Sequence, residues 1–579
     1  MLKLEDLKAV RKFFRGNEKR SSNGTYKLII EGMFHFDVPE NCVPELACGK
    51  IELKIKIHDG FPHKRPIAII EDPSLWLFPH TKMINGELCP PNDAWWAKKQ
   101  SLKAFLEYLN ELITAFASND SEKPGDYYEL PNFPVDPKNH GNYMTFEEAD
   151  NQIWLQSAAK VGFFSFVIEE PKIRLQQIDV KPDQNRESSH GIFVWLPRDP
   201  IVKYKRPPTN WGELDQVLRE HGFSVASVIK KMRQFDFPQK KEVCVILGFP
   251  TKIKNNATAT SVHWQPFKFS NREFNLIIRK ARKKLKKESV YFSAAVDDFL
   301  LSKKNEKIEY FYSYDCSKQS LYSRIGPMIE KKSYAIFGCG AIGSHLAFEL
   351  TRAGTDNLCL IDSQFIEPGN LCRHVLDFSS VHKNKAKELC LKLKRINPSG
   401  EFASYELDIF SLNSEAIEME KISSCNVWID AGLPASTSNY LSSLAVQQKK
   451  RMISCYVTDK AKYLVVLISG YECNPTNIRI EENLMTLLKE TEDEKFKNCF
   501  EALTKLEAGG AVRPSVGCYS LTFQASGAQI VSVAAIAYSI MSNFDDGQDK
   551  AGGVKIYEYD KNSFTYSLLI DKEEANDLV

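Results

Sequence analysis

Three closely spaced glycines are the first residues in the sequence that suggest a chemical role. Gly338, Gly340 and Gly343 form a GxGxxG pattern directly after the apolar segment Tyr334–Phe337. Glycines allow a backbone to approach a phosphate, and the free amides at the start of a helix favour an anion. Asp362 follows about 20 residues later, where a carboxylate can accept hydrogen bonds from ribose hydroxyls. The pattern predicts a nucleotide site, with a chance glycine turn in an ordinary α/β domain as the alternative.

Polar residues after Asp362 separate two classes of nucleotide-binding enzyme. Asn370, Arg373 and Lys385 would place an amide and two cations near the phosphates. Positive charge there neutralises a triphosphate and stabilises a leaving pyrophosphate. Asp430 ends a short apolar segment, so its carboxylate is expected at the carboxyl edge of a sheet, where it could hold Mg²⁺. A nicotinamide-dependent oxidoreductase needs none of these groups, so the pattern favours ATP and Mg²⁺.

A thiol near such a site could act as a nucleophile that captures an activated acyl group as a thioester. The candidates are Cys455, Cys473, Cys499 and Cys518. Cys455 lies in an apolar segment, where burial raises the pKa of a thiol and makes it unreactive. Cys518 lies near Arg513 in a loop-like segment before the expected terminal helix, a setting that favours an exposed and partly ionised thiol. We therefore expect Cys518 to be catalytic, with Cys499 as the reserve candidate.

Cys89 is the candidate thiol near the start of the chain. It follows an Asn-Gly pair, precedes Pro90 and Pro91, and is followed by Trp95 and Trp96. A cysteine among turn residues and prolines is poorly suited to core packing, although simple packing is the alternative. Two accessible thiols on one chain would have a high effective concentration, which favours acyl exchange between them.

Composition and charge exclude several classes of protein. The 579 residues include 76 basic and 74 acidic side chains, so no global field directs the chain to nucleic acid or to an anionic membrane. The first residues lack a signal-peptide pattern, and the apolar run Ile530–Met541 is shorter than the roughly 20 residues of a membrane span, which favours a buried helix. No CxxC pair occurs among the 14 cysteines, so we expect no structural zinc and reduced thiols in a cytoplasmic protein.

The elements that must position these residues divide the chain into three blocks. Residues 1–120 combine an opening helix, alternating strands and a closing helix, and residues 143–318 mix strands and helices. In the second block, the basic segment Arg272–Lys287 is expected to be a helix with a solvated face, contact with acidic partners being the alternative. Residues 321–579 open with a strand, a glycine turn, a helix over Ser344–Ala353 and another strand. We therefore predict two α+β domains followed by a Rossmann-like α/β domain.

From Leu321 to Tyr538 the residues resemble the activating-enzyme superfamily, which includes ubiquitin-activating enzymes and ThiF/MoeB-type bacterial adenylyltransferases. The resemblance implies binding of ATP and Mg²⁺, and a homodimer. It also implies these roles: ribose binding by Asp362, phosphate binding by Asn370, Arg373 and Lys385, Mg²⁺ binding by Asp430, and entry of Arg324 into the ATP site of the dimer partner. Two motifs depart from the family pattern. The family's NLNRQ is NLCRH here, with His374 at the glutamine position, and its DxD motif is Asp362-Ser363-Gln364.

The passage around Cys89 resembles the ubiquitin-conjugating fold, in which an HPN…NGxIC segment precedes a tryptophan and a helix. By this resemblance Cys89 is the acceptor thiol. The family asparagine that would stabilise an oxyanion is absent from its place, because the HPN motif is Pro79-His80-Thr81 here. Asn85, Asn92 and His80 are candidates to replace it, and a different transfer chemistry is the alternative.

The order of a conjugating-like domain, a spacer and an activating domain resembles the fused activating–conjugating proteins of bacterial CBASS anti-phage operons. This resemblance implies that the C-terminal glycine of a cGAS-like nucleotidyltransferase is adenylated, captured on Cys518, passed to Cys89 and joined to a lysine of a target protein. Activation of a ubiquitin-like or sulfur-carrier protein in another bacterial operon is the first alternative. A non-catalytic scaffold and a nicotinamide oxidoreductase are the others. The acceptor proteins, the ligand of residues 143–318, and transfer within one chain or across the dimer stay open.

Overall fold

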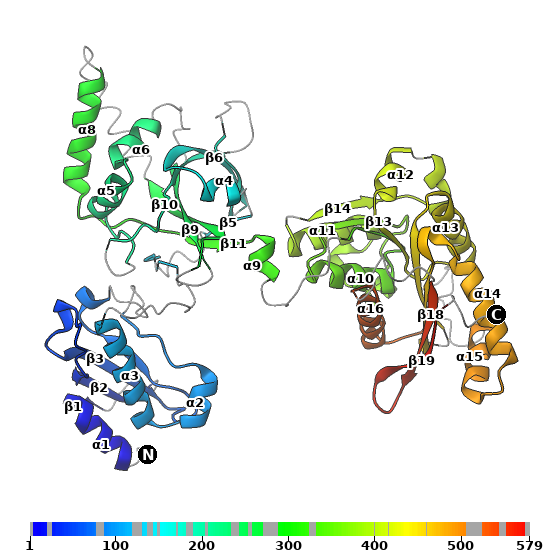
Figure 1. The fold of residues 1–579 in the computed structure, drawn as a ribbon, viewed down its shortest axis with the longest axis horizontal. Helices are drawn as coiled ribbons and strands as arrows, with labels where there is room; N and C mark the ends of the chain where they lie inside the picture. The colour runs from blue at the N-terminus through cyan, green and yellow to red at the C-terminus, as the bar shows by residue number, and fades with distance from the viewer. Residues whose placement is uncertain are drawn as a thin grey trace. The chain divides into compact units, whose positions relative to one another are not determined.

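The computed structural model describes residues 4–19, 26–76, 86–118, 130–131, 133–135, 143–147, 151–169, 172–180, 189–202, 206–232, 243–252, 257–269, 288–322, 332–398, 400–414, 416–458, 460–504, 524–542 and 552–573. The chain forms two compact units, Met1–Cys316 and Ser317–Val579 (Figure 1). In the described part of the chain, strands form two sheets in the first unit and one in the second. None of the helices there has the length and apolar content that crossing a bilayer requires.

The first sheet is a four-stranded antiparallel meander in the order β1-β2-β3-β4. This part of the unit consists of α1 (Leu4–Phe13), β1 (Phe14–Lys19), β2 (Tyr26–His35), β3 (Lys50–His58), β4 (Ile67–Ile70), α2 (Asp93–Lys99) and α3 (Leu102–Ala117). Side chains of β3 alternate between the two faces, so Ile51, Leu53, Ile55 and Ile57 are buried together. The apolar face of α3, including Phe105, packs into the same core.

The second sheet has seven strands in the order β10-β9-β8-β6-β7-β5-β11. The strands are β5 (Tyr143–Phe146), β6 (Lys160–Glu169), β7 (Lys172–Ile178), β8 (Ser189–Trp195), β9 (Val243–Thr251), β10 (Ser261–Phe269) and β11 (Tyr312–Asp315), and the helices are α4 (Asn151–Leu155), α5 (Trp211–Glu220), α6 (Val225–Met232) and α8 (Glu288–Lys303). Adjacent residues Val194 and Trp195 of β8 belong to different cores, so both faces of the sheet are covered. One core includes α5, α6 and α8, and the other includes Trp154 of α4.

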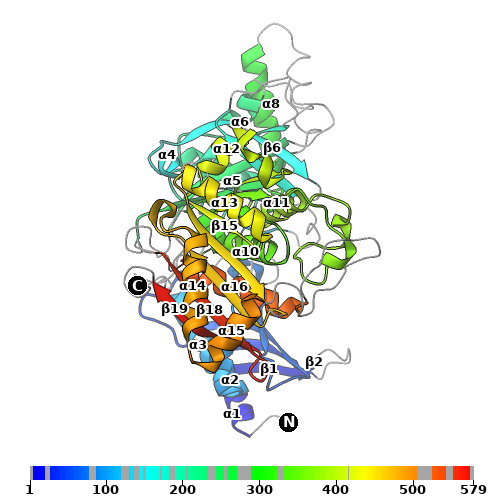
Figure 2. The ribbon, with the colours of Figure 1, turned by 90° about the vertical axis from the view of Figure 1, so that its right-hand side faces the viewer.

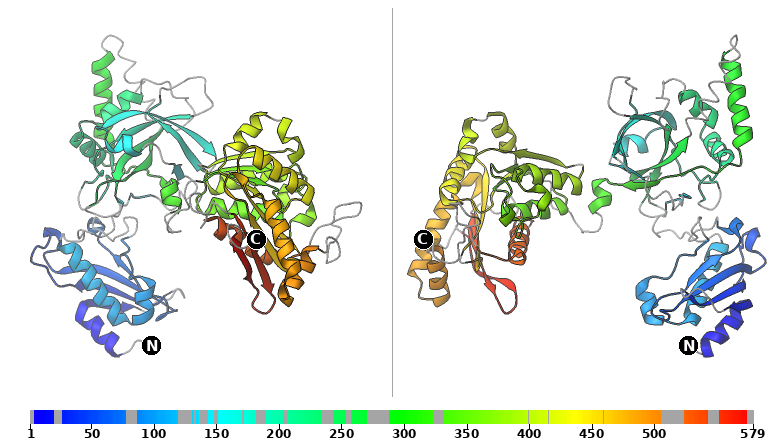
Figure 3. Two further views of the ribbon diagram at one scale, coloured as in Figure 1. Left: turned by 45° about the vertical axis from the view of Figure 1, so that its right-hand side comes forward. Right: turned by 180° about the vertical axis from the view of Figure 1, so that it is seen from behind.

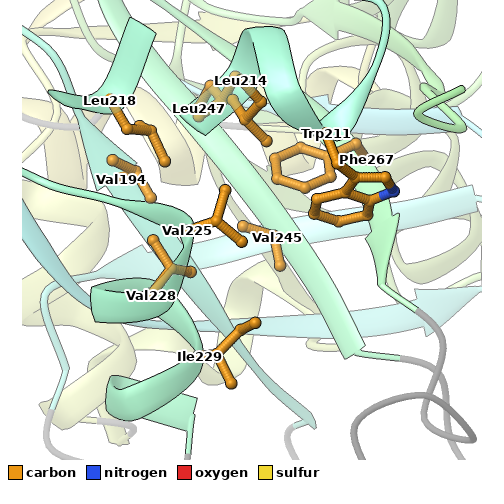
Figure 4. Close-up of a pocket in the computed structure, with 10 residues that line it drawn as sticks. All are labelled: Val194, Trp211, Leu214, Leu218, Val225, Val228, Ile229, Val245, Leu247 and Phe267. Carbon is orange, nitrogen blue, oxygen red and sulfur yellow. The ribbon is translucent and has the colours of Figure 1, made fainter. Parts of the chain in front are cut away.

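A small gap remains in the core under α5 and α6 (Figure 4). It is lined by Val194, Trp211, Leu214, Leu218, Val225, Val228, Ile229, Val245, Leu247 and Phe267. Its volume is about 10 Å³, at the lower limit for one water molecule, and no polar surface faces it. The gap is therefore imperfect packing and not a ligand site.

The second unit contains an eight-stranded sheet in the order β14-β13-β12-β15-β16-β17-β18-β19. Strands β12 to β16 are parallel, and β17 to β19 are antiparallel additions. The strands are β12 (Tyr334–Phe337), β13 (Asn357–Ile361), β14 (Glu401–Tyr405), β15 (Val427–Asp430), β16 (Arg451–Thr458), β17 (Tyr463–Ile468), β18 (Gly553–Asp560) and β19 (Thr565–Glu573). The helices are α9 (Lys318–Tyr322), α10 (Ala341–Arg352), α11 (Lys385–Ile396), α12 (Ala416–Ser423), α13 (Ala435–Gln447), α14 (Asn477–Glu490), α15 (Glu494–Thr504) and α16 (Gly527–Ser542).

Helices cover both faces of this sheet (Figures 2 and 3). Helices α10, α11 and α16 share a core with Ile336 of β12 and Ile429 of β15, whereas α12 and α13 pack around Phe337 and Trp428 on the other face. Helices α14 and α15 cover β17 and β18. The carboxyl ends of β12, β13 and β15 meet at one edge of the sheet, where ligands bind in folds of this kind. This arrangement confirms the Rossmann-like α/β fold, preceded by α+β regions.

Two details of the predicted elements are wrong. The helix after the glycines begins at Ala341 and not at Ser344, because Gly340 is its N-cap. The helix that follows Cys518 is not terminal, since β18 and β19 come after it and extend the sheet. The buried helix predicted over Ile530–Met541 is confirmed by α16. The whole basic segment Arg272–Lys287 lies outside the described residues.

Candidate functional site

The turn from β12 into α10 is shaped by two of the three glycines, Gly338 in the loop and Gly343 in the first turn of α10. Gly338 has a φ of +91°, a backbone conformation that residues with a Cβ rarely adopt. A Cβ at Gly343 would lie 1.9 Å from the carbonyl oxygen of Gly338, so only glycine lets α10 approach the loop this closely. A Cβ at Gly340 would meet no atom within 4 Å. Packing therefore does not require glycine at position 340, and its backbone faces space that a ligand can occupy.

A cavity of about 800 Å³ lies beside this loop at the carboxyl edge of the parallel strands. This volume is typical of small-molecule sites. The predicted residues that line it are Gly338, Gly340, Asp362, Asn370, Arg373 and Lys385. Two other predicted residues are not among the residues described as lining it: Gly343 acts through packing, and Asp430 lies behind the turn after β15. The fold thus brings most of the predicted nucleotide residues to one cavity.

Asp362 and Asn370 are held in place by contacts with neighbouring backbone. Asp362 Oδ2 accepts a hydrogen bond from Cys339 N at 2.8 Å, and its Oδ1 accepts one from Gln364 N at 2.8 Å. A carboxylate oxygen can accept two hydrogen bonds, so each retains capacity for a ligand hydroxyl. Asn370 Oδ1 accepts from Glu367 N at 3.0 Å at the end of the short helical turn Pro368–Asn370. Both side chains are therefore in fixed positions at the cavity wall.

Arg373 and Lys385 bring two nearly buried cations to the cavity, with 8% and 7% of their surfaces exposed. Lys385 is the first residue of α11, and its Nζ donates to the side-chain Oε1 of Gln364 at 2.7 Å. This acceptor is neutral, so the contact does not cancel the charge of the lysine. Burying the charge of Lys385 against a neutral acceptor is costly, and an anionic ligand in the cavity would reduce that cost.

Asp430 occupies the predicted position at the end of β15, but the following turn engages its carboxylate. Its Oδ1 accepts from Gly432 N at 3.1 Å and Leu433 N at 2.9 Å, and its Oδ2 accepts from Ser438 Oγ at 2.5 Å. Burial raises the pKa of this carboxyl group in spite of these hydrogen bonds. Within the described ranges, no three His, Cys, Asp or Glu side chains come together as metal ligands. Mg²⁺ often takes only one or two carboxylates plus phosphate oxygens, so the donor set fits if Asp430 gives up part of this network.

Among the thiols of the second unit that the structure describes, Cys372 is exposed and the others, including all described candidates, are buried. Burial raises the pKa of Cys455 to about 12, as expected for a cysteine inside a strand. Cys499, the reserve candidate, is also buried, and burial raises its pKa to about 11, which makes it a poor nucleophile at neutral pH. Burial likewise raises the pKa of Cys473. Cys518 and Arg324 lie outside the described residues, so their roles stay predictions.

Cys89 lies in the first unit beside a cavity of about 370 Å³ and is half-buried. Its carbonyl oxygen accepts a hydrogen bond from Tyr108 Oη at 3.0 Å. Burial is the main reason that the pKa of Tyr108 is raised to about 12, so this hydroxyl remains a donor at neutral pH. Arg65 Nη1 donates to the carbonyl oxygen of Pro91 at 3.0 Å and forms an ion pair with Asp93. Side-chain contacts therefore hold the backbone at Cys89 and in the residues that follow it.

The structure describes one of the three candidates to replace the missing asparagine near Cys89. Asn92 caps α2, because its Oδ1 accepts from Trp95 N at 2.8 Å. This contact uses the acceptor oxygen of the side-chain amide, so Asn92 stays a candidate through its amide nitrogen, the group that could donate to an oxyanion. Asn85 and His80 lie outside the described residues.

Several residues at these sites were not predicted from the sequence. His374, noted only as a departure from a motif, links the loop carrying Arg373 to the glycine loop. Tyr456 lines the nucleotide cavity at the end of β16, and its hydroxyl donates to Glu481 of α14. The available signal for His374 was that histidine replaces the family's glutamine in NLCRH. No local pattern marks the pair of Tyr456 and Glu481, because the two residues lie on separate elements, β16 and α14.

Comparisons with known proteins match both the second unit and the middle of the chain. Residues 327–569 match the ThiF family, and residues 121–315 match the Cap2 central linker domain. A relative described as ATP-dependent ubiquitin transferase-like protein Cap2, from Enterobacter hormaechei subsp. hoffmannii (strain UCI 50), is 23% identical over 375 residues, 61% of each chain. A relative with the same description from Pseudomonas aeruginosa (strain BWHPSA011 / Pa011) is 35% identical over 82 residues, 14% of this chain and 15% of that one. The chain is a Cap2-like protein of the ThiF family.

This Cap2-like chain spans about three fifths of the length of the Enterobacter relative that it matches. Among solved structures, E. coli MccB with AMPCPP and MccA is 14% identical, with 54% of this chain and 93% of that chain covered and a TM-score of 0.30. PaaA is 17% identical, with 44% and 75% covered and a TM-score of 0.29. TM-scores of this size support no inference about what the Cap2-like chain binds.

Proposed function

We propose that the cavity of the second unit binds ATP and joins AMP to the C-terminal carboxylate of another polypeptide. The observation that carries the proposal is the open space in front of Gly340, bordered by Asp362 and by the nearly buried cations Arg373 and Lys385. A helix N-terminus, a carboxylate acceptor and two cations around one space suit a nucleoside triphosphate. The ThiF-family match of residues 327–569 supports the same activity.

Each side chain has a distinct part in the proposed reaction. The amides at the start of α10 bind phosphate oxygens, and Asp362 accepts from the ribose hydroxyls. A carboxylate oxygen of the donor polypeptide attacks the α-phosphorus, and the bond from that phosphorus to the leaving oxygen breaks. The products are an acyl adenylate and pyrophosphate. Arg373 and Lys385 stabilise the negative charge that develops on the pyrophosphate. Mg²⁺ bound at Asp430 would neutralise further phosphate charge.

The acyl group is then proposed to pass through two thiols. The Cys518 thiolate attacks the acyl carbon and AMP leaves, after which the Cys89 thiolate attacks the thioester and the Cys518 thiolate leaves. The amine of a target lysine finally attacks the Cys89 thioester, which forms an amide bond and returns the thiol. The hydrogen bond from Tyr108 and the contacts of Arg65 support the second step by fixing the backbone around Cys89. The relatives described as ubiquitin transferase-like agree with such a transfer.

The finer parts of the proposal concern partners and assembly. We expect the donor to be the C-terminal tail of a cGAS-like nucleotidyltransferase in anti-phage defence. We also expect a homodimer in which Arg324 enters the ATP site of the other copy. Both expectations rest on the resemblance of the sequence. A ubiquitin-like or sulfur-carrier donor would use the same chemistry, and mass spectrometry of the polypeptide trapped on Cys518 or Cys89 separates these donors.

ATP–pyrophosphate exchange tests the adenylation step. Purified protein is incubated with Mg²⁺-ATP, labelled pyrophosphate and candidate donor polypeptides with free carboxyl termini. Exchange is expected only with a donor, and Lys385→Met should reduce it by roughly 10² to 10³, the usual effect of losing one charge-stabilising group. Lys383→Met is the matched control, because Lys383 is exposed and pairs with Glu388. Absence of exchange with every donor, or equal exchange in both variants, would refute the proposal.

A further inference from the structure

His374 joins two loops that form the wall of the nucleotide cavity. Its Nε2 lies 2.7 Å from the carbonyl oxygen of Cys339, and its Nδ1 lies 3.1 Å from Leu376 N. A backbone N–H can only donate and a carbonyl oxygen can only accept. Nδ1 is therefore the acceptor nitrogen, and Nε2 carries the proton that is donated to Cys339. These two contacts specify one tautomer of a neutral ring.

The surroundings of His374 keep the imidazole neutral. The residue is 8% exposed, and burial is the main reason that its pKa is lowered to about 4. Lys385, Lys392 and the neighbouring His345 lower the pKa further, and the bond to the Cys339 carbonyl opposes them. At neutral pH the ring therefore has one donor and one acceptor, and both are used within the protein.

Cys339 is the residue that His374 and Asp362 hold from opposite sides. It lies between Gly338 and Gly340, so its peptide groups orient the glycine loop. Its N–H donates to Asp362 at 2.8 Å, and its carbonyl oxygen accepts from His374 at 2.7 Å. Its side chain is fully buried. The loop conformation thus depends on two polar contacts as well as on the glycines themselves.

We propose that His374 is a positioning residue of the nucleotide site, which holds the glycine loop in its phosphate-binding conformation through the Cys339 carbonyl. This inference rests on the proposed ATP site. The length of the side chain at position 374 decides whether it can reach the Cys339 carbonyl oxygen. The amide nitrogen of glutamine is as many bonds from Cα as Nε2 of histidine, whereas that of asparagine is as many bonds away as Nδ1. His374→Gln can therefore keep the bond to Cys339, and His374→Asn cannot.

Isothermal titration of the full-length protein with ATP, without any donor polypeptide, measures the effect on nucleotide affinity. His374→Asn is expected to weaken ATP binding by about tenfold, the upper range for one hydrogen bond. His374→Gln should stay within about twofold of the wild type. His263→Asn is the matched control, because His263 lies in the first unit, is also 8% exposed and has its pKa lowered to about 4 by burial. It should leave ATP affinity unchanged.

Alkylation of buried thiols separates release of the loop from general unfolding. Cys339, Cys390 and Cys455 share one core and are 0%, 5% and 0% exposed. In His374→Asn, iodoacetamide should label Cys339 at least about tenfold faster while the other two thiols stay protected, and His374→Gln should protect all three. The positioning role is overturned if the three thiols of His374→Asn are labelled at equal rates, or if His374→Asn binds ATP with wild-type affinity. A wild type that binds no ATP refutes the proposed function instead, and selective labelling of Cys339 would still support the link between the loops.

Discussion

Alanine at Gly340 in the nucleotide loop and at Gly343 in the first turn of α10 should separate ligand binding from packing. Gly340 has a φ of −78°, and an added methyl group there would meet no atom within 4 Å, so Gly340→Ala is expected to fold normally. The same methyl group would occupy space that phosphate oxygens need. At Gly343 the methyl group would lie 1.9 Å from the Gly338 carbonyl oxygen, so Gly343→Ala must distort the loop or α10 even without ligand.

The size of each effect follows from these distances. Real Cβ atoms essentially never approach another atom closer than 3.0 Å, so Gly343→Ala has to lengthen a 1.9 Å contact to at least that value. Overpacking of this kind costs about 1 to 3 kcal/mol, and each kcal/mol lowers the melting temperature of a unit of this size by roughly 2 to 4 °C. Gly340→Ala should cost no more than about 1 kcal/mol, because Gly340 is the N-cap of α10 and alanine is a poorer N-cap than glycine. It should still weaken ATP binding by about tenfold or more, since contacts to charged groups contribute about 1.5 to 3 kcal/mol.

Calorimetry of the wild type and both variants, with and without ATP, measures the two effects together. ATP should raise the melting temperature of the wild type and have much less effect on Gly340→Ala. Gly343→Ala should melt at a lower temperature in the absence of ligand. Equal destabilisation of the two variants would mean that the space in front of Gly340 is not open. Wild-type ATP affinity in Gly340→Ala would mean that no phosphate approaches this part of the backbone.

Three further predictions concern the proposed reaction. Asp430→Asn should abolish pyrophosphate exchange yet melt at a higher temperature at neutral pH, because folding raises the pKa of this carboxyl and its ionised form costs stability. As the pH falls through the folded pKa of Asp430, the melting temperature of the wild type should rise relative to that of the variant. Calorimetry that shows the opposite trend contradicts this reasoning. Cys518→Ala should retain exchange without forming a thioester, whereas Cys89→Ala should accumulate the donor on Cys518; unimpaired conjugation by Cys89→Ala, read on non-reducing gels, would eliminate the relay. Tyr108→Phe should leave exchange unchanged and slow transfer to Cys89 by up to about tenfold in single-turnover measurements, since one hydrogen bond contributes about 0.5 to 1.5 kcal/mol. Equal transfer rates would show that the contact with the Cys89 carbonyl has no influence.

The core elements of the second unit were predictable because their signals are local. A short apolar run between polar residues and a glycine turn has few alternatives, and β12 has the predicted bounds Tyr334–Phe337. The apolar run Ile530–Met541 likewise required burial and is part of α16. The hairpin of β18 and β19 was not predicted, because its place in the sheet is decided by pairing with β17. Such tertiary contacts override weak local preferences for a strand.

The candidate site was predictable as a set of residues but not as a network of contacts. Spacing alone indicated that Asp362, Arg373 and Lys385 would meet, because the carboxyl ends of parallel strands converge. It could not show that the Asp430 carboxylate turns toward its own loop or that His374 holds Cys339. Both features depend on side-chain direction and loop closure, which leave no periodic pattern in a sequence.

The neutral partner of Lys385 would make the folding stability of the second unit depend on the concentration of an anionic ligand. The Gln364 amide leaves the buried lysine charge in place, so the folded state without nucleotide carries a cost that an anion removes. A ligand present at a hundred times its dissociation constant adds about 2.7 kcal/mol to folding stability. If ATP is that ligand, starvation would leave a larger unfolded fraction open to proteases. The ATP pool would then govern how long the enzyme survives as well as how fast it turns over.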